Sequence, residues 1–344
     1  MNPRCPVTQH PPLPDAWTLT ASAFNWTPEV IRAERSAPDI AVGIVADDVA
    51  PVIEVELGQL WRSFPTPTDE EADEFASALV TAGGAVSIVG VSLDDWATPT
   101  RRRDDDERLA FLLPQLRTSH RIGAAGVRLP IGQAGRPLLE RLRPHLHELD
   151  LTLYEEIQGQ QTPQNPVTAA AIESLAAIDD PRVRLLVDVS MLMPALPDSY
   201  LDALATGGVS SDLLARLRTA WLESDTMDAV VGMLRSGGVP RRVQTMYMNL
   251  LVRFGRSRAE DLRGVVPLTG AFHLKFWDLD DTADRVSQPL RDLGALLAST
   301  GFRGTLTSEW GGHEWLDDED ASDITRRHLS LARAALADGA AAST

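Results

Sequence analysis

The chain has 344 residues, of which 44% are hydrophobic, and a formal net charge of −17. This length and composition suit a globular protein with one large domain or two ordinary ones. The negative charge would repel the backbones of nucleic acids and the surfaces of anionic membranes, so neither is an expected partner. The single cysteine, Cys5, excludes a disulfide within the chain and a multi-cysteine zinc site.

The start of the chain has no continuous apolar region of the kind that signal peptides contain. No stretch reaches the roughly 18 apolar residues that suggest a transmembrane helix. We therefore expect a cytoplasmic protein. Residues 1–16 are rich in proline and predict an extended arm, whereas the low-complexity residues 338–344 predict a frayed tail.

Eight predicted strands alternate with helices between residues 17 and 337. One further stretch, 40–49, fits a helix or a strand. The strand patterns lie at 17–25, 51–57, 85–93, 126–130, 151–157, 183–189, 271–275 and 305–309. Such alternation implies parallel strands joined by crossover helices, hence an α/β protein.

Eight units of this kind predict a (β/α)8 TIM barrel that forms a single domain over residues 17–337. A doubly wound open sheet is the alternative, but no Gly-rich phosphate-binding loop follows a first strand. Residues 194–250 show helical spacing and no strand pattern. They predict a helical insertion between the sixth and seventh strands, over the barrel mouth or at an oligomer interface.

Four ionisable residues lie near the C-terminal ends of the last four predicted strands: Glu156, Asp188, His273 and Glu309. The two-residue period of a strand directs all four inward, at the end of the barrel where active sites lie. Ionisable groups in a dry core need a partner, and one divalent cation would satisfy all four. A ligand set rich in oxygen with one nitrogen suits Mn²⁺ first, then Mg²⁺ or Co²⁺, with Zn²⁺ also compatible.

Three of these residues also have a simpler interpretation. A strand bulge would turn Glu155 inward in place of Glu156. Taken alone, His273 fits a hydrogen-bonded core histidine and Asp188 fits a turn cap. The metal site is predicted by the four residues together at strand ends.

Four neighbours complete the candidate site. Lys275, the only lysine in the chain, shares a strand face with the histidine and would stabilise an enolate oxygen or pair with an inward carboxylate. His313, in the loop after the eighth strand, is a candidate acid/base or sugar-binding residue. Trp277 and Trp310 are candidates for stacking on a sugar ring or an aromatic aglycone.

The strand motifs LTLYEEI, LLVDVSM, HLK and SEW resemble those of the sugar phosphate isomerase/epimerase superfamily, the xylose-isomerase-like TIM barrels, over about residues 17–337. The resemblance implies that the four strand-end residues bind one divalent metal and that Glu156 and Glu309 act as acid and base. Many members carry histidine where this chain has Gln158 and Met191. Gln158 is therefore a candidate substrate-binding residue, and a common ketose is not the expected substrate.

The long insertion and the SEWGGH ending are similar to the large (alpha) subunit of bacterial C-glycoside deglycosidases, which cleave 3-oxo C-glycosides together with a small β-rich subunit. This similarity implies a hetero-oligomer with a small beta subunit. A homo-oligomer is the other expectation.

The leading functional prediction is proton abstraction next to a sugar carbonyl. Reprotonation would give an isomerase or epimerase, and loss of a β-substituent would give a carbon–carbon lyase acting on an oxidised glycoside. Tryptophans near the last two strand ends, Trp315 among them, favour a substrate larger than a free sugar. A metal-dependent nuclease of the apurinic-endonuclease type is disfavoured by the charge and by seven scattered histidines. A non-catalytic sugar-binding or assembly barrel is the remaining alternative.

Overall fold

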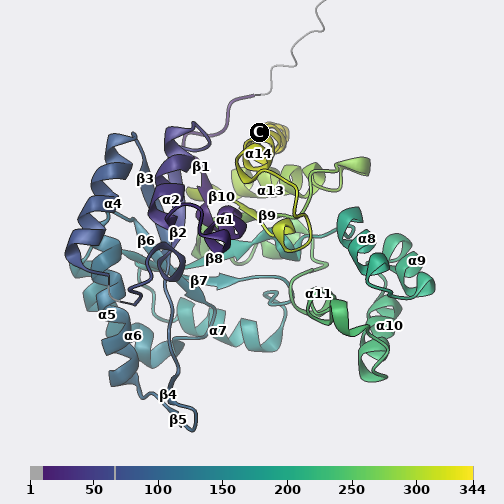
Figure 1. Ribbon diagram of the computed structural model, residues 1–344, viewed down its shortest axis with the longest axis horizontal. Helices are drawn as coiled ribbons and strands as arrows, with labels where there is room; N and C mark the ends of the chain where they lie inside the picture. The colour runs from purple at the N-terminus through teal and green to yellow at the C-terminus, as the bar shows by residue number, and fades with distance from the viewer. Residues whose placement is uncertain (1–10, 66, 344) are drawn as a thin grey trace, which may run out of the picture.

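The computed structural model describes residues 11–65 and 67–343. Its centre is a closed barrel of parallel strands in the order β1-β10-β9-β8-β7-β6-β3-β2 (Figure 1). The strands are β1 (Trp17–Ser22), β2 (Val52–Glu56), β3 (Ala85–Gly90), β6 (Gly126–Pro130), β7 (Thr152–Ile157), β8 (Val183–Asp188), β9 (Thr269–Phe276) and β10 (Gly304–Trp310). The predicted eight-stranded barrel is confirmed, and the open sheet is wrong.

The helices that follow the strands pack around the barrel and share one continuous apolar core with it. Within the described residues, no helix has the length and apolar character needed to cross a membrane. The outer helices are α1 (Thr27–Arg32), α2 (Ala37–Ala46), α3 (Leu57–Leu60), α4 (Asp69–Thr81), α5 (Asp105–Arg121), α6 (Gly135–Glu148), α7 (Pro166–Ala176), α13 (Ser287–Thr300) and α14 (Ala321–Ala342).

Local hydrogen bonds decide several helix starts. The Ser36 side chain accepts a hydrogen bond from the Asp39 amide, so the ambiguous stretch after it is helical. Thr68 caps α4 and Asp104 caps α5, each in a reciprocal capping box. The first strand is shorter than predicted because the Ser22 side chain accepts from the Phe24 amide and starts a 3-10 turn. A short hairpin of β4 (Trp96–Thr98) and β5 (Arg101–Arg102) was not predicted.

The C-terminal residues continue a helix instead of fraying. Helix α14 runs to Ala342 and packs along α13. Gly339 allows this close approach, because a Cβ at that position would overlap the backbone carbonyl of Arg291. Residues 1–10 of the expected arm lie outside the described residues, and residues 11–16 form neither helix nor strand.

Helices occupy the segment between β8 and β9. They are α8 (Asp198–Thr206), α9 (Ser211–Thr219), α10 (Ser224–Arg235), α11 (Gln244–Tyr247) and α12 (Asn249–Val252). In Figure 1, α8, α9 and α10 gather to one side of the barrel. They share a second apolar cluster, to which Phe254 and Trp277 also belong.

One buried histidine of α14 packs against the barrel strands. The His328 ring stacks on Phe276, with ring centroids 3.8 Å apart, and its Nδ1 lies 2.8 Å from the Ser308 hydroxyl. Burial lowers the pKa of His328 to about 3. The unfolded chain therefore binds a proton that the folded chain excludes, and stability is lost as pH falls below about 6.5, by up to about 1.4 kcal/mol per pH unit.

We predict that His328→Asn makes stability less dependent on pH. Asparagine keeps a polar atom near the Ser308 hydroxyl but cannot bind a proton in this range. Urea denaturation between pH 6.5 and 5 should give a free energy of unfolding that falls less steeply for the variant than for the wild type. Parallel slopes would show that His328 is not excluded from protonation in the folded chain.

Candidate metal centre

Four adjacent strands bring the four predicted ligands together. Glu156 comes from β7, Asp188 from β8, His273 from β9 and Glu309 from β10, and all four side chains are buried. Asp188 and His273 are register partners, so the strand ends are level there. One ligand atom from each residue lies within 4.8 Å of the other three. The residues predicted from strand parity thus form one compact group of donors.

The donor geometry fits a divalent cation. Nδ1 of His273 lies 3.1 Å from Glu156 Oε1, 3.0 Å from Glu309 Oε2 and 4.0 Å from Asp188 Oδ2. Asp188 Oδ1 accepts a hydrogen bond from the Ser190 amide, but its Oδ2 is buried without a hydrogen-bond partner among the described residues. Buried polar atoms are normally satisfied, and a metal ion would satisfy this one. Three carboxylates and one imidazole are a ligand set that Mn²⁺ and related ions accept.

The opposite nitrogen of the histidine is held by a carboxylate that the sequence analysis missed. Nε2 of His273 lies 2.9 Å from Glu54 Oε1 on β2. When Nε2–H donates to Glu54, the lone pair of Nδ1 is directed at the three acidic ligands. A carboxylate behind a histidine ligand fixes the ring and its tautomer in many metal sites. The alternation in PVIEVEL, residues 51–57, could have revealed this carboxylate, because a period of two places Glu54 and Glu56 on one face of the strand.

A second missed residue, Arg128 on β6, connects the carboxylates. Its Nε lies 2.7 Å from Glu54 Oε1 and its Nη1 lies 2.8 Å from Glu156 Oε2. Its Nη2 pairs with Glu56. One guanidinium therefore holds three carboxylates through separate nitrogen atoms, which fixes their relative positions.

The charges of the centre follow from burial and pairing. Burial opposes ionisation of Glu156 and Glu309, but nearby cations, above all Arg128 and His273 respectively, outweigh it and lower the pKa of both carboxyls. Burial raises the pKa of Asp188 to about 6. Burial also disfavours a charged His273, yet the surrounding carboxylates outweigh it and raise the pKa of this histidine well above its usual value. A metal ion would have to displace that proton from Nδ1.

Glu155 points away from this group. It is buried, and its Oε1 accepts a hydrogen bond from the Gly132 amide at 3.2 Å. Burial raises the pKa of Glu155 to about 7. The strand therefore presents Glu156 to the barrel interior, and the alternative with Glu155 inward is wrong.

A cavity of about 860 Å³ opens above the metal ligands. Its walls include Glu156, Glu309, Gln158 and Lys275, together with Val252 of α12. Nζ of Lys275 lies 3.2 Å from Glu309 Oε2, so the lysine forms the ion pair that the sequence offered as one of its two roles. A charged group beside Glu309 and on the cavity wall is also placed to meet a bound substrate.

The remaining predicted residues do not line this cavity. The ring of His313 lies between Phe24 and Trp310, and burial lowers its pKa to about 4, so it is neutral near pH 7. Trp310 is buried, and its Nε1–H donates to the Trp277 carbonyl at 2.9 Å. Trp277 stacks on Trp315 at a centroid distance of 5.6 Å. Trp277 and Trp315 pack in the apolar cluster of the insertion, whereas Trp310 belongs to the core of the barrel and its outer helices. These contacts are tertiary, so strand parity does not reveal them.

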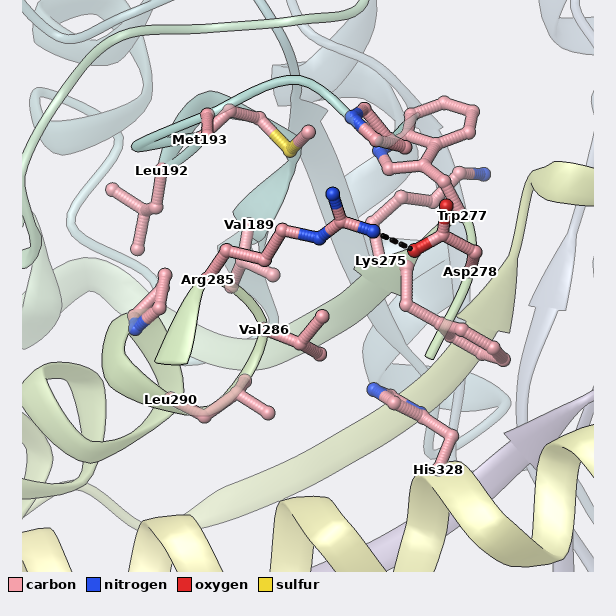
Figure 2. Close-up of a pocket in the computed structure, with 14 residues that line it drawn as sticks. Val189, Leu192, Met193, Lys275, Trp277, Asp278, Arg285, Val286, Leu290 and His328 are labelled. Carbon is pink, nitrogen blue, oxygen red and sulfur yellow. Dashed lines mark hydrogen bonds and ion pairs between the residues drawn. The ribbon is translucent and has the colours of Figure 1, made fainter. Parts of the chain in front are cut away.

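A separate small cavity of about 40 Å³ lies beside the end of β9. Figure 2 shows Arg285 directed at Asp278 across it, with Val286 and Leu290 of the α13 region nearby; the Arg285 Nη2 to Asp278 Oδ1 distance is 2.8 Å. Its lining is mainly apolar and holds none of the four metal ligands. The larger cavity is therefore the candidate for substrate.

We predict that the protein binds one divalent ion per chain and that His273→Ala greatly reduces the bound metal. Elemental analysis of protein loaded with Mn²⁺ measures the stoichiometry. His328→Asn is a matched control, because it removes another buried histidine that lies outside the metal centre. Equal stoichiometry in the His273→Ala variant and the wild type would contradict the assignment.

A second prediction concerns the carboxylate behind the histidine. Glu54→Gln should lower the affinity for Mn²⁺ by roughly 10- to 100-fold, because the amide no longer stabilises the Nε2–H of His273 as a carboxylate does. Calorimetric titration measures the change. Glu56→Gln removes a charge from the same arginine without touching the histidine, so its metal affinity should stay near that of the wild type. Equal losses in both variants would assign the effect to Arg128 instead.

No protein-family model matches the chain. Among characterised proteins, the C-glycoside deglycosidase alpha subunit of Arthrobacter globiformis is 26% identical over 326 residues, covering 92% of each chain. The 3'-dehydrocarminate deglycosidase alpha subunit of a Microbacterium species is 25% identical over 328 residues, covering 92% of this chain and 94% of that protein.

The solved structures show the same fold. A D-psicose 3-epimerase crystallised in the presence of D-fructose superposes with a TM-score of 0.56 at 12% identity, covering 93% of this chain and 99% of the other. A sugar phosphate isomerase/epimerase from Parabacteroides distasonis gives 0.54 at 10% identity, with 96% of each chain covered. The predicted resemblance is confirmed: the chain is related in sequence to C-glycoside deglycosidase alpha subunits and shares its barrel fold with sugar isomerases and epimerases.

Proposed function

We propose that the protein is a metal-dependent enzyme that removes the proton next to the carbonyl of an oxidised glycoside and then expels the aglycone by β-elimination. The observation that carries this proposal is the buried group of Glu156, Asp188, His273 and Glu309 beneath a cavity of about 860 Å³. The names of the sequence relatives, which are deglycosidase alpha subunits, support the elimination.

The four strand-end residues would hold the metal. When bound, a divalent ion, Mn²⁺ as first choice, supplies Lewis-acid polarisation of a sugar carbonyl and a fixed point for adjacent oxygens. The burial of the ligands and the arrangement of His273 between Glu54 and the acidic group support a preformed site.

The base is one of the two glutamates that line the cavity, Glu156 or Glu309. Both have a lowered pKa and are therefore ionised near neutral pH, as a proton acceptor must be. The ammonium of Lys275, next to Glu309, would stabilise the negative charge that develops on the enolate oxygen. Gln158 also lines the cavity and would hydrogen bond with sugar hydroxyls.

The volume and the lining of the cavity favour a glycoside over a free sugar. Its volume lies toward the upper part of the roughly 300 to 1,000 Å³ typical of small-molecule sites. Phe24 and Phe64 on its walls offer apolar contact to an aglycone. Simple isomerisation or epimerisation of a free ketose is the second candidate, because it uses the same base and metal and needs no leaving group.

A small beta subunit would complete the enzyme. The relatives in sequence are named as alpha subunits, which implies a partner in those proteins. Here Val252 of α12 is 55% exposed at the border of the cavity and would lie in the contact with such a partner. A homo-oligomer is the alternative assembly.

We predict that the Mn²⁺-loaded protein, isolated from its native host with any associated subunit, cleaves 3-oxo-glycosides and exchanges the proton next to the ketone in D₂O. Glu156→Gln and Glu309→Gln should each lower cleavage by at least about 10²-fold, the lower end of the contribution of an acid or base. Mass spectrometry of products and of recovered substrate gives both readouts.

Two results would contradict this prediction in different ways. Turnover of free ketoses without any action on glycosides would make the protein a plain isomerase or epimerase. Absence of deuterium from every recovered sugar, with intact metal loading, would remove proton abstraction altogether and favour a binding role.

A further inference from the structure

The cavity has a carboxylate on the side that faces the metal ligands. The four ligands occupy the consecutive strands β7, β8, β9 and β10, so β1, β2, β3 and β6 form the opposite half of the barrel. Glu56 ends β2, in that opposite half. Its side chain is 23% exposed and lines the cavity. A ligand whose sugar oxygens lie at the metal centre would therefore extend its other end toward Glu56.

Neighbouring residues make room for this carboxylate and hold it. Gly90 of β3 also lines the cavity, and a Cβ at that position would overlap the Glu56 carboxylate. The backbone of Gly90 is ordinary, so space, and not conformational freedom, explains the glycine. One oxygen of Glu56 pairs with Nη2 of Arg128, whose other nitrogens are occupied by Glu54 and Glu156. The carboxyl group is thus held by one hydrogen bond from Arg128, which its carbonyl oxygen accepts, while the rest of it faces the cavity.

The charges at this end of the barrel balance only if one carboxyl group carries a proton. The carboxyl groups that gather there are Glu54, Glu56, Glu156, Asp188 and Glu309. Arg128 and Lys275 supply two positive charges, and a divalent ion with a neutral His273 would supply two more. One negative charge would remain without a counter-charge. Glu56 is the carboxyl that contacts neither the histidine nor the metal ligands, and burial raises its pKa to about 7.

We propose that Glu56 is a second catalytic residue of this cavity, a general acid that gives a proton to the departing aglycone. This rests on the proposed elimination. A glutamate at the metal centre takes the proton from the carbon next to the ketone, and that electron pair forms a carbon–carbon double bond in the sugar. The bond between the neighbouring carbon and the aglycone breaks, and its electron pair takes the proton of the Glu56 carboxyl. The products are an unsaturated oxidised sugar and the protonated aglycone, and Glu56 is left as a carboxylate paired with Arg128.

The other cavity groups suit this task less well. Glu156 and Glu309 have lowered pKa values and are ionised, so they accept protons instead of giving them. Lys275 is paired with Glu309 on the metal side. Loss of a carbon-linked aromatic aglycone without a proton would leave a strongly basic carbanion, so an acid at the far wall would act directly on the difficult step.

The test compares two leaving groups on the same 3-oxo sugar, using the complete Mn²⁺-loaded enzyme. A carbon-linked phenol ring needs a proton as it leaves, whereas an oxygen-linked 4-nitrophenolate leaves without one. Glu56→Gln should lower cleavage of the carbon-linked substrate by roughly 10² to 10⁴-fold and change cleavage of the 4-nitrophenyl substrate by only a few fold. Deuterium exchange next to the ketone and metal content should match the wild type. Glu74→Gln, at an exposed position of α4, is the control.

Each outcome decides the proposal. Equal losses on both substrates, or no loss on either, would overturn the acid role and leave the elimination intact. If the glutamine variant does not fold, Glu56→Asp replaces it, because a shorter acid should slow the carbon-linked substrate selectively and an unselective effect would overturn the role. If the wild-type enzyme exchanges no deuterium and cleaves neither substrate, the proposed function fails and the acid role fails with it.

Discussion

The structure of this end of the barrel depends on how buried carboxylates are kept charged and separated. Burying an ionised group is costly unless it is paired or hydrogen bonded, and here several acids converge within a few ångströms. His273 is the central element, since one nitrogen contacts Glu54 and the other faces the acidic ligands. Arg128 also pairs with two of these carboxylates, Glu54 and Glu156. Asp188 Oδ2 has no hydrogen-bond partner among the described residues, and a cation bound there would complete this balance.

The barrel fold brings these charged side chains together at one end of the sheet. Consecutive parallel strands end at one level, so side chains that are far apart in sequence become neighbours without any special loop. The proposed base lies on the half of the barrel that would hold the metal, and the proposed acid lies on the other half. A substrate between them would be held at its sugar and protonated at its aglycone, which is the separation of roles that an elimination needs. The insertion contributes α12 to the rim and buries the tryptophans that follow β9 and β10.

Much of this was predictable from periodicity, because strand parity depends only on a period of two. Parity placed Glu156, Asp188 and His273 correctly inside the barrel, and the alternation of strands and helices predicted the closed sheet. The same parity applied to PVIEVEL would have placed Glu54 inside, but a carboxylate that supports a ligand has no motif of its own. The burial of Trp277 could not be predicted, because it depends on how the non-local helices of the insertion pack against the end of β9. The C-terminal helix was underestimated because its contacts with α13 are tertiary and its own composition is simple.

The central claim is that the ends of β7 to β10 hold one divalent ion through Nδ1 of the histidine. Anomalous diffraction at the manganese edge, from crystals of Mn²⁺-loaded protein, tests it most directly. The account predicts a single strong peak within bonding distance of Glu156, Asp188, Glu309 and Nδ1 of His273, with Nε2 still turned to Glu54. A peak elsewhere would contradict the account. So would the absence of a peak at this position in crystals of protein loaded with excess Mn²⁺.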